Sequence, residues 1–309
     1  MRGQPVIDLA PGHKLGLIAS SPVLLAGGIL GLGDTLPVGV DTSRLGGVVV
    51  GPLQRHPRAG AAPPRLADAP GHFVLESGLQ NRGVNATRKR YARYWSRLGC
   101  PVIVQLADTD LHFLAQVAGQ LAEHEGVSGF ELLVPRLQGQ FEKRGDARGE
   151  LSVAWLQQAL RVVDEQSDLP IWVKLPLEQA AALAPIAVAA GAAAIVVGRP
   201  PLGMLARTMA DAADTGDGQP DPTAPPPTAA GASALIRGEF FGPALLPLML
   251  SALSEVVQQA LPAAIIACGG IHTAAAAEQA LAVGATAFQL DSAVWIEPGI
   301  VDLIQRSVS

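Results

Sequence analysis

Short apolar segments with strand character recur along this chain, and helical segments separate most of them. They occupy residues 22–28, 46–51, 101–106, 129–134, 170–175, 193–197, 264–271 and 287–291. Strands that are apolar throughout and alternate with helices are typical of parallel sheets, which are buried on both faces. The repeat predicts a single α/β domain over residues 1–309, folded as a closed (βα)8 TIM barrel.

The composition agrees with a large buried core. Hydrophobic residues make up 49% of the 309 residues and charged residues 16%, which excludes disorder for most of the chain. The formal net charge of -5 argues against nucleic acid or an anionic membrane surface as the main partner. A protein partner and a homo-oligomer both remain open as forms of assembly.

Targeting and membrane segments are not expected. No apolar run of signal-peptide length directly follows the first residues. The most hydrophobic stretch, residues 181–197, is interrupted by Pro185 and Gly191 and falls short of the roughly 20 apolar residues of a membrane span. Cys100 and Cys268 lie beside predicted strands, so we interpret them as core residues in a reducing compartment. We expect a soluble, cytoplasmic protein without a metal site.

One region breaks the alternation of strands and helices. Residues 205–236 are rich in proline and aspartate and lack hydrophobic periodicity, with consecutive prolines at 225–227. Such a segment buries too little apolar surface to fold alone. We therefore predict a flexible insert, extended or disordered, at the carboxyl end of a strand.

The strand at residues 129–134 and the loop after it lie where chemistry is expected, because active sites of repeating strand–helix folds occupy the carboxyl ends of strands. The loop offers Leu133, Pro135, Arg136 and Leu137, and no carboxamide before Gln138. It contains neither a nucleophile nor a general base. The chain is therefore either an enzyme with relocated chemistry or a barrel that has lost its chemistry.

Eight motifs, in order over nearly the whole chain, carry a resemblance to a known family. They lie at residues 21–28, 63–66, 78–83, 169–175, 202–204, 242–244, 268–273 and 289–294. On these motifs the chain resembles the dihydroorotate dehydrogenases, the FMN-dependent TIM barrels of pyrimidine synthesis. The resemblance implies the same fold, but a fold does not carry its activity with it.

The substrate positions depart from the family pattern. Residues 51–52 are Gly-Pro where the family has a lysine, and residues 75–76 are Leu-Glu where it has Asn-Ser. Arg199 and Pro200 replace an Asn-Thr or Asn-Ser pair. Each lost hydrogen-bond partner costs about 1–3 kcal/mol of substrate recognition. The resemblance therefore implies a divergent paralogue that lacks most substrate-binding residues.

The catalytic base is also missing from its family position. Leu133 replaces the first asparagine of that motif, Pro135 and Arg136 take the Ser-Cys positions, and Gln138 replaces the final asparagine. Leucine, proline and a permanently protonated arginine cannot abstract a proton from a substrate carbon. The catalytic residues, if the chain has any, are unknown from the sequence.

The cofactor positions are better kept. The resemblance assigns the flavin ring and the ribityl phosphate to Ala26, Gly27, Lys174, Gly242, Gly269, Gly270 and Ser292. Backbone N–H groups of glycines near helix starts suit a phosphate. Asp291, however, stands where the family has glycine, and its carboxylate would repel a phosphate. Alternatively, Lys174 pairs with an acid in the barrel mouth and the glycines only preserve turns, so FMN remains open.

Three functional hypotheses follow from the resemblance. The first is a non-catalytic barrel that serves as an accessory or assembly subunit. The second is an FMN-dependent oxidoreductase on a different substrate, with Arg136 or Arg199 binding an anionic group. The third is dihydroorotate oxidation through an unusual base.

Overall fold

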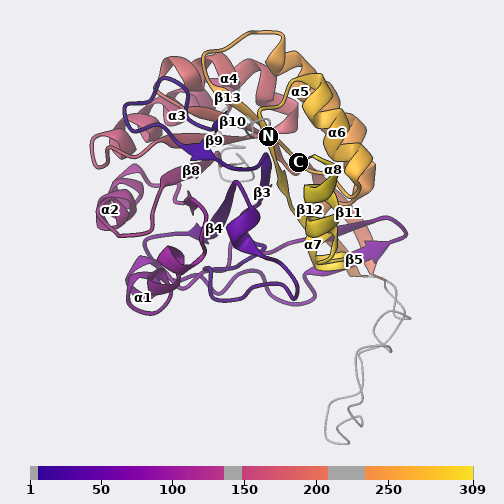
Figure 1. Cartoon of the computed structure of the whole chain (residues 1–309). Helices are drawn as coiled ribbons and strands as arrows, with labels where there is room; N and C mark the ends of the chain where they lie inside the picture. The colour runs from indigo at the N-terminus through magenta and orange to yellow at the C-terminus, as the bar shows by residue number, and fades with distance from the viewer. Residues whose placement is uncertain (1–5, 136–147, 208–233, 309) are drawn as a thin grey trace, which may run out of the picture.

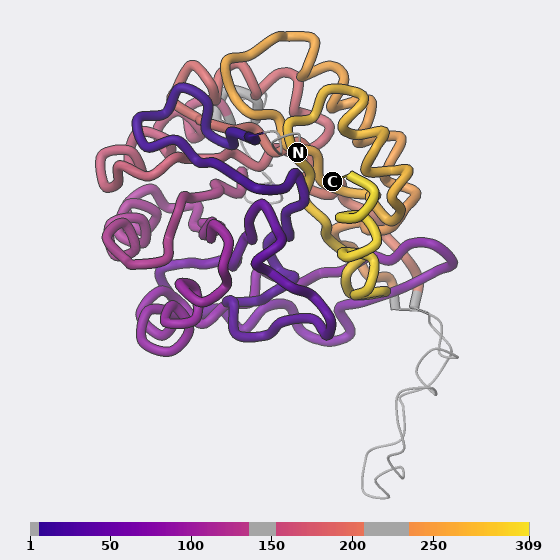
Figure 2. Tube along the Cα trace, viewed as in Figure 1, coloured from indigo at the N-terminus to yellow at the C-terminus, as the bar shows by residue number. Residues whose placement is uncertain are grey.

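Eight parallel strands close into a barrel in this computed structural model, which describes residues 6–135, 148–207 and 234–308. Around the barrel the strands follow chain order, and the last pairs with the first through Phe288 and Val23. Figures 1 and 2 show the chain winding once around the barrel. The strands are β3 (Val23–Leu25), β4 (Gly47–Leu53), β7 (Val102–Leu106), β8 (Gly129–Leu133), β9 (Ile171–Pro176), β10 (Ala194–Arg199), β13 (Ala264–Cys268) and β14 (Ala287–Leu290). The predicted TIM barrel is confirmed.

Helices surround these strands on the outside of the barrel (Figure 1). Sequence signals set several of their ends: Asp110 caps the first turn of α2 through its side chain, and Gly284 ends α6 in the left-handed region. The α-helices are α1 (Val84–Arg90), α2 (Leu111–Leu121), α3 (Arg148–Asp164), α4 (Ala180–Ala189), α5 (Leu246–Val257), α6 (Ala274–Val283), α7 (Ser292–Ile296) and α8 (Ile300–Ser307). Short 3-10 turns are η1 (Thr42–Arg44), η2 (Ala92–Arg97), η3 (Leu177–Gln179) and η5 (Pro243–Leu245).

A second sheet of four antiparallel strands lies to one side of the barrel (Figure 1). Its order is β11 (Leu202–Arg207), β12 (Ala234–Phe241), β6 (His72–Leu75) and β5 (Leu66–Ala69). A small apolar cluster of Ala67, Val74 and Ile236 packs across three of its strands, β5, β6 and β12. A separate two-stranded pair, β1 (Ile7–Asp8) with β2 (Ile18–Ala19), precedes the barrel.

The second sheet corrects the prediction of a flexible insert over residues 205–236 at both ends of that range. Its two ends are strands, because Leu205 pairs with Ile236 and Arg207 with Ala234 across the β11–β12 ribbon. Cross-strand pairing and packing on the sheet, which single-chain periodicity does not register, explain the difference. The rest of the predicted insert, residues 208–233, lies outside the described residues.

The core fills the barrel wall and the layer between strands and helices. Every residue of β7, β8 and β13 is buried, as expected for strands covered on both faces. Within the described ranges, no helix combines the length and apolar character that crossing a membrane requires. The apolar residues at 181–197 instead form most of α4, a turn and the first part of β10.

Candidate functional site

A cavity of about 250 Å³ lies at the carboxyl ends of the barrel strands, where sites of this fold are found. Each of the eight barrel strands, or the loop directly after it, contributes to its wall. In strand order these residues include Ala26, Pro52, Gln105, Leu133, Lys174, Arg199, Cys268 and Asp291. Three of the residues assigned to the flavin, Ala26, Gly27 and Lys174, are therefore brought together here.

A chain of hydrogen bonds runs across the barrel interior beneath this cavity. Glu131 is fully buried, and each of its carboxylate oxygens accepts one amide: Gln105 Nε2 donates to Oε1 at 2.7 Å, and Gln289 Nε2 to Oε2 at 2.6 Å. Lys174 Nζ donates to Gln289 Oε1 at 2.8 Å. The chain satisfies the buried polar groups internally, as a low-dielectric interior demands.

The interior charges decide the protonation of Lys174. Burial alone would lower the pKa of Lys174, but Cys268, Glu131 and Asp291 together raise it above its usual range. Burial raises the pKa of the Cys268 thiol to about 12, so the thiol is neutral at physiological pH. The two carboxylates are therefore what keep the lysine charged, in agreement with a lysine that balances acids of the barrel mouth.

Asp291 is the N-cap residue of α7, and its carboxylate accepts hydrogen bonds from the next residue, Ser292. Its Oδ1 accepts from the backbone nitrogen of Ser292 at 2.6 Å and from Ser292 Oγ at 3.1 Å. Ser292 Oγ also lies 3.2 Å from His272 Nε2. Burial raises the pKa of Asp291. The carboxylate thus engages the backbone N–H and hydroxyl of a residue that the resemblance assigned to FMN.

The three glycines assigned to the phosphate are explained by packing. Gly242, Gly269 and Gly270 all have positive φ, at 130°, 106° and 75°. A Cβ on Gly270 would lie 2.3 Å from the backbone nitrogen of Leu246, and one on Gly242 would lie 2.4 Å from the carbonyl oxygen of Gly71. None of the three borders the cavity. Only glycine fits these close approaches, whether or not a ligand is held.

Tested against FMN, the site fits the ring better than the phosphate. The ring-side residues line the cavity, and Lys174 is charged there. On the phosphate side, the serine amide is already bonded to the Asp291 carboxylate, which would repel a phosphate. The phosphate side therefore does not fit the cofactor as the sequence resemblance implies it.

The two arginines proposed for an anionic substrate are not seen together. Arg199 is buried; its Nε donates to Glu239 Oε1 at 3.2 Å and its Nη1 donates to the carbonyl oxygen of Val134. Arg136 lies outside the described residues. The charge of Arg199 is balanced by Glu239, an interaction between β10 and β12 that no local motif signals.

An aromatic rim borders the cavity and was not predicted. Phe73 and Phe241 stack with ring centres 5.2 Å apart, and Trp295 lies 6.2 and 6.1 Å from them. Phe241 and Trp295 line the cavity. The rim joins β6, β12 and α7, which are distant in sequence. Aromatic residues make up only 4% of the chain, and this scarcity is the one sequence feature that draws attention to the three that form the rim.

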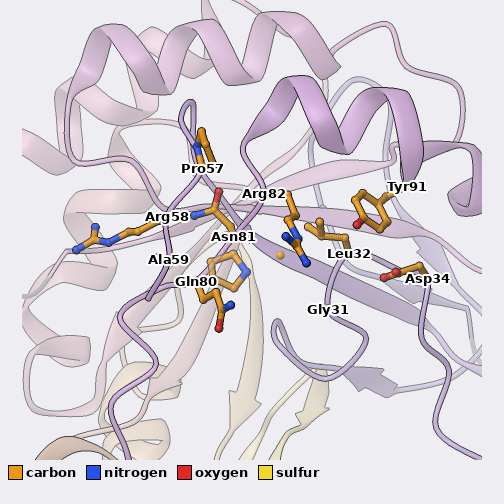
Figure 3. A pocket seen from close by; sticks show the side chains of 12 residues that line it. Gly31, Leu32, Asp34, Pro57, Arg58, Ala59, Gln80, Asn81, Arg82 and Tyr91 are labelled. Carbon is orange, nitrogen blue, oxygen red and sulfur yellow. The ribbon is translucent and has the colours of Figure 1, made fainter. Parts of the chain in front are cut away.

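A second hollow of about 600 Å³ adjoins the cavity (Figure 3). The two share Gly31, Gly51, Pro52 and Gln80. In Figure 3 the side chain of Arg82 points toward Leu32, whereas Arg58 points away to the other side. Within the ranges that the structure describes, no group of three or more histidine, cysteine or carboxylate side chains is placed to hold a metal ion.

Comparison with known proteins agrees with the fold and the motifs. The family model for dihydroorotate dehydrogenase matches residues 13–309. The dihydroorotate dehydrogenase B (NAD(+)) catalytic subunit of Thermodesulfovibrio yellowstonii is 30% identical over 306 residues, covering 97% of this chain and 92% of the relative. The protein of the same name from Solidesulfovibrio magneticus is 31% identical over 290 residues, covering 92% and 86%. The chain belongs to the dihydroorotate dehydrogenase family.

Proposed function

We propose that this chain is a dihydroorotate dehydrogenase-family barrel that no longer oxidises dihydroorotate and serves as an accessory or assembly subunit. The observation that carries the proposal is the Asp291 carboxylate, which engages the Ser292 N–H on the phosphate side of the flavin site. Without a bound flavin the barrel has no hydride acceptor. Leu133, which lines the cavity, also replaces an amide that the family resemblance assigns to substrate binding.

Electrostatics support the exclusion of FMN. Two unit charges 4 Å apart interact by about 4 kcal/mol at an effective dielectric of 20. A phosphate dianion beside an ionised Asp291 would meet that repulsion for each of its charges, or would force the carboxyl to take up a proton. The repulsion weakens binding by several powers of ten, since about 1.4 kcal/mol is a factor of ten, whereas protonation costs the free energy of neutralising the carboxylate.

The subunit role draws on the relatives. The two relatives compared above are named as catalytic subunits, a term for one part of a larger assembly. We propose that this chain retains the assembly role and lacks the chemistry. The remaining insert is a candidate contact, so deletion of residues 212–230 should leave the barrel folded and weaken association with a partner. Unchanged complex mass and stability after the deletion would count against that role for the insert.

The test of lost catalysis is spectroscopic. The purified chain should be colourless, should leave the fluorescence of added FMN unchanged, and should form no orotate from dihydroorotate. A yellow protein with one FMN per chain that bleaches anaerobically with dihydroorotate would overturn the proposal and support dihydroorotate oxidation.

A second candidate is an FMN-dependent oxidoreductase with a different substrate. It is favoured by the retained ring side of the site, where Ala26, Gly27 and Lys174 line one cavity. When bound, FMN would supply a hydride acceptor. The pairing of Arg199 with Glu239 leaves less charge for an anionic substrate. Bound FMN that dihydroorotate does not bleach would support this candidate.

A further inference from the structure

The carboxylate of Asp291 is only partly compensated by the protein. Asp291 is 6% exposed, and both of its hydrogen bonds use Oδ1. In the part of the chain that the structure describes, no donor reaches Oδ2, and no cationic nitrogen lies within 4 Å of the carboxylate. Asp291 nevertheless forms part of the cavity wall. Oδ2 is therefore accessible from the cavity, where it can accept from a donor of a bound ligand.

The charges around the cavity favour a cation as that donor. Arg199 and Glu239 form an ion pair at 3.2 Å, so they largely cancel. Lys174 is then the one remaining positive side chain of the described wall, facing two carboxylates, Asp291 in the wall and Glu131 beneath it. A ligand with a positive group would balance the excess carboxylate, whereas an anion would add to it.

The rest of the wall suits an apolar ligand body. Phe241 and Trp295 form the aromatic rim on one side, and Leu133 adds an aliphatic surface. Aromatic faces attract cations, and tryptophan does so most strongly. The volume of about 250 Å³ is below the roughly 300–1,000 Å³ of sites for drug-sized ligands, so the ligand must be small.

We propose that this cavity binds a small organic cation, a protonated amine attached to a single ring or a short aliphatic chain. Its ammonium group donates to Asp291 Oδ2, and its apolar body lies against Phe241 and Trp295. The inference rests on the proposed absence of FMN, which would otherwise compete for the same cavity. It assigns the site a ligand of opposite charge to the phosphate-bearing cofactor.

The test compares three probes of one shape by calorimetry at neutral pH: benzylamine, which is protonated there, benzyl alcohol, which is neutral, and benzoate, which is an anion. Benzylamine should bind at least about tenfold more tightly than benzyl alcohol, since a hydrogen bond to a charged group discriminates by that much or more. Benzoate should show no binding. Equal affinity for benzylamine and benzyl alcohol would overturn the inference.

Two variants locate the effect. Asp291→Asn keeps an oxygen that can accept from the Ser292 nitrogen, so the fold should persist, as circular dichroism would verify. It should reduce the amine preference to about unity. Glu297→Gln removes an exposed carboxylate outside the cavity wall and should leave the preference unchanged. A preference that survives in Asp291→Asn would refute the role of Asp291.

The proposed function and this inference fail in different ways. One FMN per chain in the purified protein would overturn the proposed function. A colourless, FMN-free protein without amine preference would overturn the inference alone. In FMN-free protein, Trp295→Leu should weaken benzylamine and benzyl alcohol alike, because the ring that the two probes share lies against the indole. Unchanged binding of both probes would overturn the proposed contact between the apolar body and Trp295.

Discussion

Replacing Lys174 with methionine separates a structural lysine from one kept for a cofactor. Lys174 is 5% exposed, donates to Gln289 at 2.8 Å, and offsets the charges of Glu131 and Asp291. Methionine has similar length and no charge, so it leaves buried carboxylates without their cation. If the lysine served only a ligand, the ligand-free protein would lose little stability.

The expected cost follows from the burial of these groups. Removing one partner of a buried charge network typically costs about 3–5 kcal/mol, because the other charge is left uncompensated. That figure includes the acceptor Gln289 Oε1, whose loss of a donor alone costs about 1–3 kcal/mol. We therefore expect Lys174→Met to lower the free energy of unfolding by about 3–5 kcal/mol at about pH 8.

The deficit should depend on pH with a defined sign. Burial raises the pKa of Asp291 in the folded chain, so folding favours the protonated carboxyl; this contribution is present at low pH and lost as pH rises through the raised pKa. Removing Lys174 raises that pKa further, because the lysine charge lowers it. The deficit of Lys174→Met should therefore shrink as pH falls toward about 5 and grow toward about 8.

Urea unfolding followed by circular dichroism measures this at both pH values. Lys89→Met is the matched control, because Lys89 is exposed on α1 and its loss should change stability by less than about 0.5 kcal/mol. Adding Asp291→Asn to Lys174→Met should recover part of the loss. A deficit below about 1 kcal/mol at about pH 8, or one that does not change with pH, would refute the charge argument.

Three further predictions concern single positions. Gly270→Ala should lower the free energy of unfolding by about 3–5 kcal/mol, because φ is positive and the added Cβ would overlap the backbone. Gly28→Ala should lower it by only about 1–2 kcal/mol, because φ is 97° but no atom lies within 4 Å of the added Cβ. Urea midpoints measure both costs, and equal costs would contradict the packing explanation. Native Cys100 and Cys268, whose pKa values burial raises to about 12, should resist iodoacetamide at about pH 8 until the chain is denatured; mass spectrometry showing rapid native alkylation would oppose this. Benzylamine affinity should fall as pH drops through the raised pKa of Asp291, because the protonated carboxyl no longer attracts the ammonium; the charged and titratable groups around Asp291 are Lys174, His272, Cys268 and Glu131. Calorimetry at two pH values that finds no fall would contradict this.

The barrel could be predicted from the sequence because its signal is local. Each strand is a mostly apolar run, and helical segments separate most of the strands, so no distant partner is needed to recognise the repeat. The second sheet could not be predicted in this way. Its β6 and β12 pair Val74 with Phe240, residues far apart in the chain, and a short strand takes its character from such a partner.

In the candidate site, too, the features with a local sequence signal could be predicted and those that depend on distant partners could not. Lys174 and the glycines could be placed from motifs, since each lies at a strand end or turn that the repeat defines. The partners that fix their chemistry could not, because the bonds from Gln289 to Glu131 and from Arg199 to Glu239 join different strands. Arg199 was interpreted as a substrate contact, and its balance by Glu239 appears only once β12 is placed.

The position of Trp295 gives the molecule a built-in optical probe. Trp95 and Trp172 are fully buried and Trp155 is half-buried, whereas Trp295 is 45% exposed at the edge of the cavity. A soluble quencher should therefore extinguish the emission of Trp295 most strongly and leave Trp95 and Trp172 bright. An occupant of the cavity would shield Trp295, while Trp155, which lies outside the cavity wall, contributes a constant part, so a ligand-dependent fall in the quenchable fraction reports occupancy without a label.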